Sequence, residues 1–338
     1  MEPVNLYSDT QTRPTPEMRR AMAEADVGDE QRFLDPTVNE LQERVADLLG
    51  HEAALFLPSG TMCNLIGFRL HLGPAGDEVI LHTSSHPVNF EAGSPGAISH
   101  AMTRQLHGEG GMFTPEEVEE AVRPPGDRYG PRSRLVSVEQ TTNMGGGRVW
   151  PIERVRGVLE VARSHGLRAH LDGARLMNAV VASGVPAADW ASGFDTAWVD
   201  FTKGLGAPVG AVLCGSRELI DEAWRWKQML GGSLRQAGVL AAACLYALDN
   251  HVERLAEDHE NARVLADGLR DLGLEVEPFE TNIVMVRVPD GRARLGELMD
   301  AGVQLQAPGA DRIRCVTHLD VGRDGIERAL AAFQQVLR

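Results

Sequence analysis

The chain has 338 residues, a hydrophobic fraction of 43% and a formal net charge of −15 at pH 7. A chain of this length usually folds as about two domains, and its apolar content is ample for a large core. The acidic balance argues against a nucleic-acid partner, because binding to phosphates needs clustered basic surface.

Compartment and membrane signals are also weak. The four cysteines contain no Cys-x-x-Cys pair, so neither a metal site nor a disulfide framework is indicated. Residues 1–6 lack the basic start and apolar segment of a signal peptide. The longest apolar run, 239–248, is about half of what a membrane span needs. We expect a cytoplasmic protein with reduced thiols and no membrane partner.

Strand and helix patterns alternate through the first two thirds of the chain. A helix should begin at Pro36, capped by Asp35, and end at Gly50. We expect a further helix at 152–165 and strands at 53–57, 78–81, 135–138, 168–171 and 196–201. Alternation at this spacing predicts an α/β fold with a mostly parallel sheet sandwiched by helices.

The pattern changes near residue 247. A long charged amphipathic stretch at 251–272 gives way to short apolar runs at 282–288 and 312–316, and a last helix begins at Asp324. We expect a large domain over residues 1–246 and a smaller C-terminal α/β domain over residues 247–338.

A lysine at the end of a buried strand is the most informative single residue. Lys203 follows the 196–201 run and precedes Gly204 and Gly206, which let a backbone approach a ligand. Of the chain's 33 basic residues, only Lys203 and Lys227 are lysines. A chain that prefers arginine keeps lysine where an imine must form with an aldehyde, because a guanidinium cannot form one. The alternative, a surface loop lysine, is disfavoured by the apolar residues before it.

Two other strand ends carry polar residues. Ser59-Gly60-Thr61 follows the 53–57 strand, and its hydroxyls and free N–H groups suit a phosphate, although these residues are also ordinary helix caps. Asp172 directly follows the 168–171 strand. A buried aspartate needs a cationic partner, which could be Arg175 or a protonated ring nitrogen. A phosphate cradle, then an aspartate, then a lysine is the order expected for pyridoxal 5′-phosphate, and this favours the ring nitrogen.

Several segments resemble the threonine aldolase family of β-eliminating lyases, from residue 5 to about residue 320. The most specific are Phe56-Leu-Pro-Ser-Gly-Thr-Met62, His170-Leu-Asp-Gly-Ala-Arg-Leu176 and Thr202-Lys-Gly-Leu-Gly-Ala-Pro-Val-Gly210. The resemblance implies the aspartate-aminotransferase-like fold (fold type I) of pyridoxal-phosphate enzymes. It implies cleavage of β-hydroxy-α-amino acids such as threonine to glycine and an aldehyde.

The resemblance also implies roles for individual residues. Lys203 matches the lysine that holds the cofactor, Asp172 the partner of its pyridine nitrogen, and His86 the histidine that stacks on its ring. Residues Ser59, Gly60 and Thr61 match the phosphate loop. The groups that hold the substrate carboxylate correspond to Ser8, Arg175 and Arg314.

Two further basic residues bear on the oligomeric state of the protein. Lys227 and Arg235 match residues that reach the cofactor phosphate of a neighbouring subunit, although a basic helix face explains them equally well. The resemblance therefore implies a homodimer or homotetramer with shared active sites.

The chain departs from the family at two places. It has Arg32-Phe33-Leu34 where members carry tyrosine, glycine and glutamate, and Thr142 where they carry a histidine near the β-hydroxyl. His86 is then the remaining candidate for the base. If these residues border the pocket for the leaving aldehyde, we expect bulkier side chains than threonine's, or an acidic one attracted by Arg32. If residues 32–34 form a solvent-exposed loop whose sequence has changed without consequence, they carry no information about substrate specificity.

Two alternatives differ in chemistry. The same residues could serve a β-eliminating lyase or an aminotransferase acting on another amino acid. The glycines at 204, 206 and 210 could suggest a nucleotide-binding module, but the run Ala211–Cys214 after them predicts a strand and not the required helix.

Overall fold

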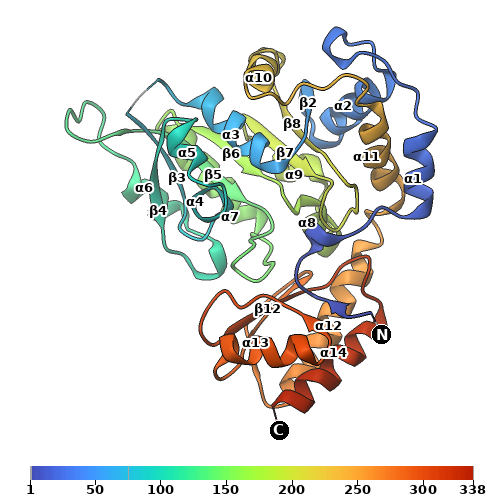
Figure 1. The fold of residues 1–338 in the computed structure, drawn as a ribbon. Helices are drawn as coiled ribbons and strands as arrows, with labels where there is room; N and C mark the ends of the chain where they lie inside the picture. The colour runs from blue at the N-terminus through green and yellow to red at the C-terminus, as the bar shows by residue number, and fades with distance from the viewer. Residues whose placement is uncertain (1, 75, 338) are drawn as a thin grey trace.

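Seven strands form the central sheet of the computed structural model, which describes residues 2–74 and 76–337 (Figure 1). Their order is β2-β8-β7-β6-β5-β3-β4, and β8 runs in the opposite direction to the other six strands. The predicted mostly parallel sheet is therefore confirmed. The bounds are Ala53–Leu57 (β2), Asp77–His82 (β3), Ala101–Leu106 (β4), Arg132–Glu139 (β5), Arg168–Asp172 (β6), Thr196–Asp200 (β7) and Ala211–Gly215 (β8).

Helices cover both faces of this sheet. Strand β2 shows why: Leu55 and Leu57 pack into one apolar cluster with α3 and α10, while Phe56 between them packs into the cluster on the opposite face. Alternation of this kind buries both faces of the sheet. The helices of this part are α1 (Pro16–Ala23), α2 (Pro36–Leu49), α3 (Gly60–His71), α4 (His86–Asn89), α5 (Ser94–Ala97), α6 (Pro115–Ala121), α7 (Ile152–Ser164), α8 (Leu176–Ser183), α9 (Ala187–Ala191), α10 (Arg217–Met229) and α11 (Gly238–Asn250).

The ends of α2 follow local chemistry. The Asp35 side chain accepts a hydrogen bond from the Val38 N–H at 3.1 Å, and Pro36 occupies the first helical position. Gly50 ends the helix with a φ of 69°, a left-handed conformation that glycine adopts without a steric penalty. Both predicted ends are confirmed.

A smaller sheet lies in the C-terminal part, drawn orange to red in Figure 1. Its strands β9 (Glu275–Val276), β10 (Ile283–Arg287) and β12 (Arg312–Val316) are antiparallel. Helices α12 (Leu255–Asp271), α13 (Gly291–Asp300) and α14 (Arg323–Val336) pack with it.

The start of the chain joins this C-terminal part. Strand β1 (Val4–Asn5) pairs in parallel with β11 (Val303–Gln304). Val4 and Leu6 are buried in the same apolar cluster as the strands and helices there. The chain then crosses to the large sheet, so residues 8–12 lie between the two parts.

One strand of the seven-stranded sheet, β4, was not predicted, and neither were the two-residue strands β1, β9 and β11. Met102, Thr103, Arg104 and Gln105 of β4 are exposed, because β4 is the edge strand of the sheet. An edge strand that buries little apolar surface shows no clear two-residue hydrophobic period.

Within the described residues, no helix has the length and apolar character to cross a membrane.

Candidate active site

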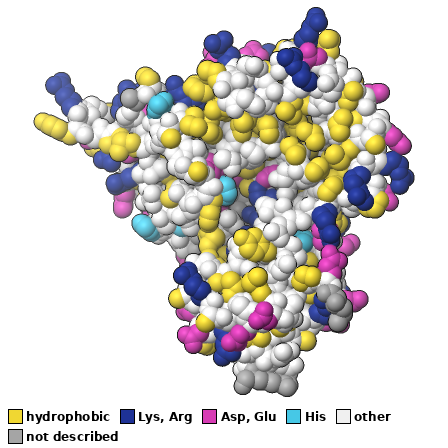
Figure 2. Space-filling view, viewed as in Figure 1, with side chains coloured by type: hydrophobic (Ala, Val, Ile, Leu, Met, Phe, Trp, Pro, Cys, Tyr) yellow, Lys and Arg dark blue, Asp and Glu magenta, His cyan; other side chains and the backbone are white. Residues whose placement is uncertain are grey.

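A cavity of about 320 Å³ lies at the carboxyl ends of β5, β6 and β7, beside the start of α3. Figure 2 shows this face of the molecule hollowed where its two parts meet. In open α/β sheets, ligands bind beyond the carboxyl ends of the strands. Nine of the predicted site residues line the cavity: Ser8, Ser59, Gly60, Thr61, His86, Asp172, Arg175, Lys203 and Arg314.

Lys203 reaches the cavity from the turn after β7. Its Nζ contacts the carboxylate of Asp200, the last residue of that strand, and lies 5.8 Å from the centre of the Trp198 ring. Asp200 is also fixed by Thr202, whose hydroxyl donates to it at 2.7 Å. The amine therefore has a defined position at the cavity wall.

Asp172 ends β6 and is 1% exposed. Its carboxylate accepts hydrogen bonds from the Asn64 amide at 2.8 Å and from the Ala174 N–H at 3.1 Å. Burial and the nearby charge of Glu139 raise the pKa of Asp172 to about 7, against the effect of Asn64. No lysine or arginine among residues 2–74 and 76–337 forms an ion pair with it. A protonated ring nitrogen would supply the missing cation.

The alternative ion pair between Asp172 and Arg175 does not form. Arg175 instead donates two hydrogen bonds to Asp9, at 2.7 Å from Nε and 2.6 Å from Nη2. Both side chains are buried. Burial would raise the pKa of Asp9, but the charge of Arg175 and its hydrogen bonds outweigh burial and lower that pKa. Asp9 therefore holds the Arg175 fork in place at the cavity.

His86 begins α4 and has a fixed ring orientation. Its Nδ1 lies 2.9 Å from the Glu91 carboxylate, and its backbone N–H donates to Glu139 at 2.7 Å. Burial lowers the pKa of His86, but the hydrogen bond to Glu91 and the charge of Asp172 outweigh burial, and the net direction is upward. Because Glu91 engages Nδ1, the neutral ring keeps its lone pair on Nε2.

Arg314 reaches the cavity from β12 and is 3% exposed. Its guanidinium donates to the Asn143 side chain at 2.8 Å and to the backbone oxygen of Tyr7 at 3.3 Å. Burial and the charge of Arg175 lower the pKa of Arg314 to about 10. Its Nε is buried without a hydrogen-bond partner among the described residues. A bound carboxylate would satisfy that N–H.

The start of α3 closes the other side of the cavity. The Ser59 hydroxyl accepts from the Met62 N–H at 3.3 Å, so serine acts as the helix cap. A side chain at Gly60 would come within 2.3 Å of the Trp198 ring, so only glycine lets the helix start approach β7. The first N–H groups of a helix have no acceptor within the helix and attract anions.

Four predicted residues do not line the cavity: Arg32, Thr142, Lys227 and Arg235. Lys227 is buried and donates to Glu30 at 2.9 Å, while Arg235 is exposed beside Asp29. Arg32 is exposed, and Thr142 is buried against the backbone of Arg148. Within one chain, these four contribute nothing directly to the cavity surface.

The cavity includes groups that the motifs did not reveal. Asp200, Glu139 and Asn143 line it, and Asn64, Glu91 and Asp9 hold its functional groups from behind. Asp9 lies within a segment that resembles the family, and Glu139 directly follows a predicted strand. Asp9 and Glu139 were therefore weakly indicated as site residues by the sequence, whereas Asn64 and Glu91 were not indicated at all.

The described residues fit pyridoxal phosphate. The cavity volume falls within the range usual for small-molecule sites, roughly 300–1,000 Å³. It presents an amine for the aldehyde, a buried carboxylate without a cation and a helix start for the phosphate. The buried Thr141 hydroxyl at its wall also lacks a partner among the described residues.

Comparisons with known proteins agree with this site. The β-eliminating lyase family model matches residues 5–290. The low specificity L-threonine aldolase of Escherichia coli (strain K12) is 40% identical over 99% of each chain.

Solved structures show the same fold. The Leishmania major threonine aldolase superposes with a TM-score of 0.87 at 20% identity, covering 99% of this chain and 100% of the other. A structure of "SPT with PLP internal aldimine" gives a TM-score of 0.75 at 20% identity over 99% and 87% of the two chains. These two likenesses confirm the predicted fold class. The sequence match confirms the predicted resemblance, and the chain belongs to the threonine aldolases within the β-eliminating lyase family.

Proposed function

We propose that this protein is a pyridoxal-phosphate-dependent aldolase that cleaves β-hydroxy-α-amino acids, such as threonine and allo-threonine, to glycine and an aldehyde. The observation that carries the proposal is the convergence of Lys203, Asp172 and the start of α3 on one cavity. Family membership supports the same reaction class.

Different residues of the chain bind different parts of the cofactor. Lys203 would supply the amine that binds the cofactor's aldehyde, Asp172 would pair with its pyridine nitrogen, and Ser59-Gly60-Thr61 would hold its phosphate. When bound, the cofactor's protonated ring accepts the electron pair released at the substrate's α-carbon. His86 lies on the same cavity and is our candidate for the group that stacks on the ring.

Orientation of the substrate selects the bond that breaks. Arg314, Arg175 and Ser8 are our candidates for holding the substrate carboxylate, and the free Nε of Arg314 supports this role. A fixed carboxylate places the bond between the α- and β-carbons in the geometry for cleavage. His86 Nε2 then accepts the β-hydroxyl proton, because Glu91 occupies Nδ1.

Assembly completes the proposed enzyme. Phe33, Leu34 and Met229 are exposed; Met229 is the last residue of α10, and the Phe33 ring packs 6.1 Å from that of Trp224 in the same helix. Figure 2 shows hydrophobic side chains in a broad band above the hollow. We propose a homodimer or homotetramer in which this surface meets a second copy. The exposed Arg235 is then better placed than the buried Lys227 to reach a neighbour's phosphate.

Three broader expectations also stand as proposals. The chain divides near residue 247 into a large and a small domain, with strand β1 packing on the small one. The protein works in the cytoplasm, which four unpaired cysteines support. Side chains larger than threonine's are accepted at least as readily as threonine, with Arg32 acting only if a neighbouring copy presents it.

Product analysis tests the proposed function. Threonine added to the yellow, cofactor-loaded protein should yield equal amounts of glycine and acetaldehyde. Release of ammonia together with a keto acid would identify a β-eliminating lyase, and a keto acid formed without ammonia would identify an aminotransferase. Either result in place of glycine would overturn the proposal.

A further inference from the structure

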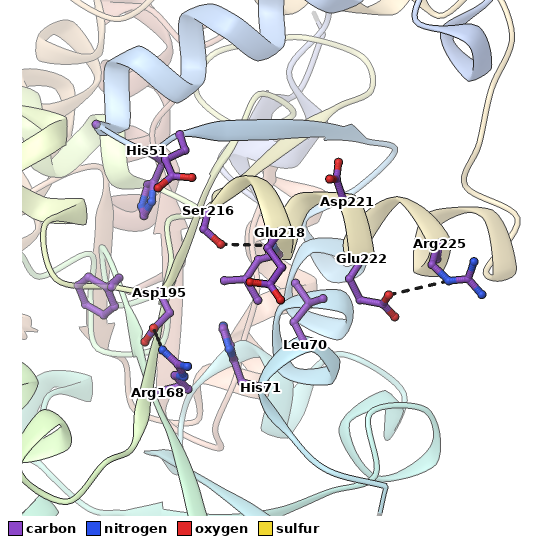
Figure 3. A pocket seen from close by; sticks show the side chains of 14 residues that line it. His51, Leu70, His71, Arg168, Asp195, Ser216, Glu218, Asp221, Glu222 and Arg225 are labelled. Carbon is purple, nitrogen blue, oxygen red and sulfur yellow. Dashed lines mark hydrogen bonds and ion pairs between the residues drawn. The ribbon is translucent and has the colours of Figure 1, made fainter.

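A second cavity lies at the amino ends of β6 and β7, whereas the active site lies at their carboxyl ends. It has a volume of about 1040 Å³ and is lined by the starts of β6 and β7, the end of α3 and the start of α10. His71, the last residue of α3, lies there beside an ion pair (Figure 3). In this pair, Arg168 Nη1 is 2.7 Å from Asp195 Oδ1. Helix α3 therefore begins at one cavity and ends at the other.

Buried hydrogen bonds connect the two cavities. His71 Nε2 is 2.9 Å from the Thr196 hydroxyl, which is 2.8 Å from His170 Nδ1. His170 Nε2 is 3.1 Å from Asn64 Oδ1, and Asn64 Nδ2 donates to Asp172 at 2.8 Å. Thr196, His170, Asn64 and Asp172 are each at most 1% exposed. Water therefore does not compete for these contacts.

The orientation of the Asn64 amide follows from its partners. The Trp198 indole can only donate, and it lies 2.9 Å from Asn64 Oδ1. The two carboxylates of Asp172 and Glu91 accept, and each lies 2.8 Å from Asn64 Nδ2. A flipped amide would place its oxygen against both carboxylates and its N–H groups against two donors. All four hydrogen-bonding capacities of the amide are used in the orientation observed.

The direction of the remaining hydrogen bonds follows from His170. Burial and the nearby His71 lower the pKa of His170 to about 3, so the ring is neutral. Because Asn64 Oδ1 only accepts, His170 carries its proton on Nε2 and accepts at Nδ1 from the Thr196 hydroxyl. Thr196 in turn accepts from His71 Nε2. Each donor from His71 to Asn64 thus points toward Asp172.

We propose that Asn64 is a positioning residue that keeps Asp172 ionised and fixed toward the cofactor's pyridine nitrogen, and that His170, Thr196 and His71 hold the Asn64 amide in that orientation from the opposite edge of the sheet. The inference rests on the proposed function, which assigns Asp172 to that nitrogen. We name this hydrogen-bonded series, Asp172-Asn64-His170-Thr196-His71, the relay.

The charges around Asp172 explain why a bridging amide matters. Glu139 and Glu91 are anionic neighbours that favour the protonated form of Asp172, and His86 is the opposing titratable group. Asn64 donates one N–H to Asp172 and one to Glu91, so it stabilises both ionised carboxylates at once. Without Asn64, the two carboxylates would each lose a donor and Asp172 would protonate more readily.

Binding of a cofactor analogue without an aldehyde tests the inference. We would titrate cofactor-free protein with 4′-deoxypyridoxine 5′-phosphate, which keeps the ring nitrogen and phosphate but cannot react with Lys203. Its dissociation constant would be measured across neutral pH for the wild type, Asn64→Leu and Thr196→Val. Asn261→Leu is the matched control, since Asn261 is buried but only donates to the backbone of Val321.

The expected result is a shift in pH dependence. Wild-type affinity should fall as the pH drops through the pKa of Asp172, which is about 7 before the analogue binds. In Asn64→Leu, the fall should begin about one to two pH units higher, because a hydrogen bond to a charged group is lost. Thr196→Val should shift in the same direction by less, and Asn261→Leu should match the wild type.

Each outcome is decisive. An unshifted Asn64→Leu protein with a native melting temperature would overturn the positioning role, and an unshifted Thr196→Val protein would overturn the relay. Should Asn64→Leu fail to fold, the nearly isosteric Thr196→Val tests the same connection. A wild type that binds no analogue contradicts the proposed function, whereas binding with coincident curves overturns only this inference.

Discussion

Individual side chains at the cavity are held by partners from distant parts of the chain. Asp9 fixes Arg175, Glu91 fixes His86, and Asp200 contacts Lys203. Groups held in this way need no reorganisation when charge develops during a reaction.

Lys203 should carry the cofactor alone. Borohydride reduction followed by peptide mapping should find the label on Lys203, and Lys203→Ala should lose its yellow colour and nearly all turnover. A guanidinium at this position cannot substitute for the amine. The control is Lys227→Met combined with Glu30→Gln, which removes the only other lysine together with its buried partner. Label on Lys227 would contradict the assignment.

Asp172→Asn should slow the reaction strongly. It removes a preorganised charge and retains the shape of the side chain, so we expect kcat to fall by about 10²–10³, or roughly 2.7–4 kcal/mol. Steady-state kinetics on threonine measures this loss, with circular dichroism to confirm folding. A rate near that of the wild type would mean that Asp172 is only structural.

Glu91→Gln should change the pH dependence of kcat/KM. Glu91 raises the pKa of His86 against the effect of burial, and a base must be neutral to accept a proton. Activity that depends on neutral His86 appears as the pH rises through that raised pKa. Losing the carboxylate lowers the pKa, so the acid limb should move to lower pH by about one unit.

The control for Glu91 is Ser94→Ala. Ser94 donates a long 3.4 Å hydrogen bond to Glu91, and its removal leaves the carboxylate in place. Its acid limb should coincide with that of the wild type. An acid limb that Glu91→Gln leaves unmoved would show that a group other than His86 controls it.

At the scale of elements, a buried ion pair attaches the short helix η2 (Glu30–Arg32) to α10. Lys227 and Glu30 have side chains that are 1% and 2% exposed, with their charged atoms 2.9 Å apart. Burial lowers the pKa of Lys227, and Glu30 opposes that shift. The pair therefore holds the loop with Phe33 and Leu34 against the large sheet's helices.

Lys227→Met should destabilise the protein by about 3–5 kcal/mol, because it leaves the buried Glu30 carboxylate without a cation. Denaturant unfolding at neutral pH measures the change in the free energy of unfolding. Adding Glu30→Gln should recover much of the loss, since no buried charge then remains. A single variant as stable as the wild type would show that Glu30 is solvated when unpaired.

Most elements that position the site were predictable from local patterns. The strands β2, β6 and β7 and the ends of α2 agree with the sequence within one residue, because apolar runs and caps act locally. The convergence of Ser59, Asp172 and Lys203 followed from parallel strands ending at one edge. The relay did not, since Asn64 and Asp172 lie 108 positions apart and Asn64 looks like any helix residue.

At the scale of the whole molecule, the exposed apolar side chains near η2 and α10 bear on assembly. Phe33 and Leu34 are 62% and 59% exposed, although they are large hydrophobic residues. Contiguous exposed apolar surface commonly marks a protein interface. A dimer through this surface would place the exposed Arg235 near a second copy.

The variant Phe33→Glu with Leu34→Glu should therefore dissociate the assembly and reduce activity, because carboxylates in an apolar interface are costly to bury. Light scattering after size exclusion gives the mass of each species. Tyr129→Glu is the control, since Tyr129 is fully exposed on a loop of the large part. A wild type that is monomeric and active would contradict shared active sites.

The pairing of β1 with β11 fixes when the active site can form during synthesis. Ser8 and Asp9 are made before the strands of the large sheet, yet Val4 and Asn5 find their strand partners only at residues 303 and 304. A ribosome-bound chain can thus fold the large sheet before Asp9 is held in place beside Arg175. The catalytic pocket can be complete only after residue 304 has been made, so a chain truncated before residue 303 should retain the large sheet and lack a functional site.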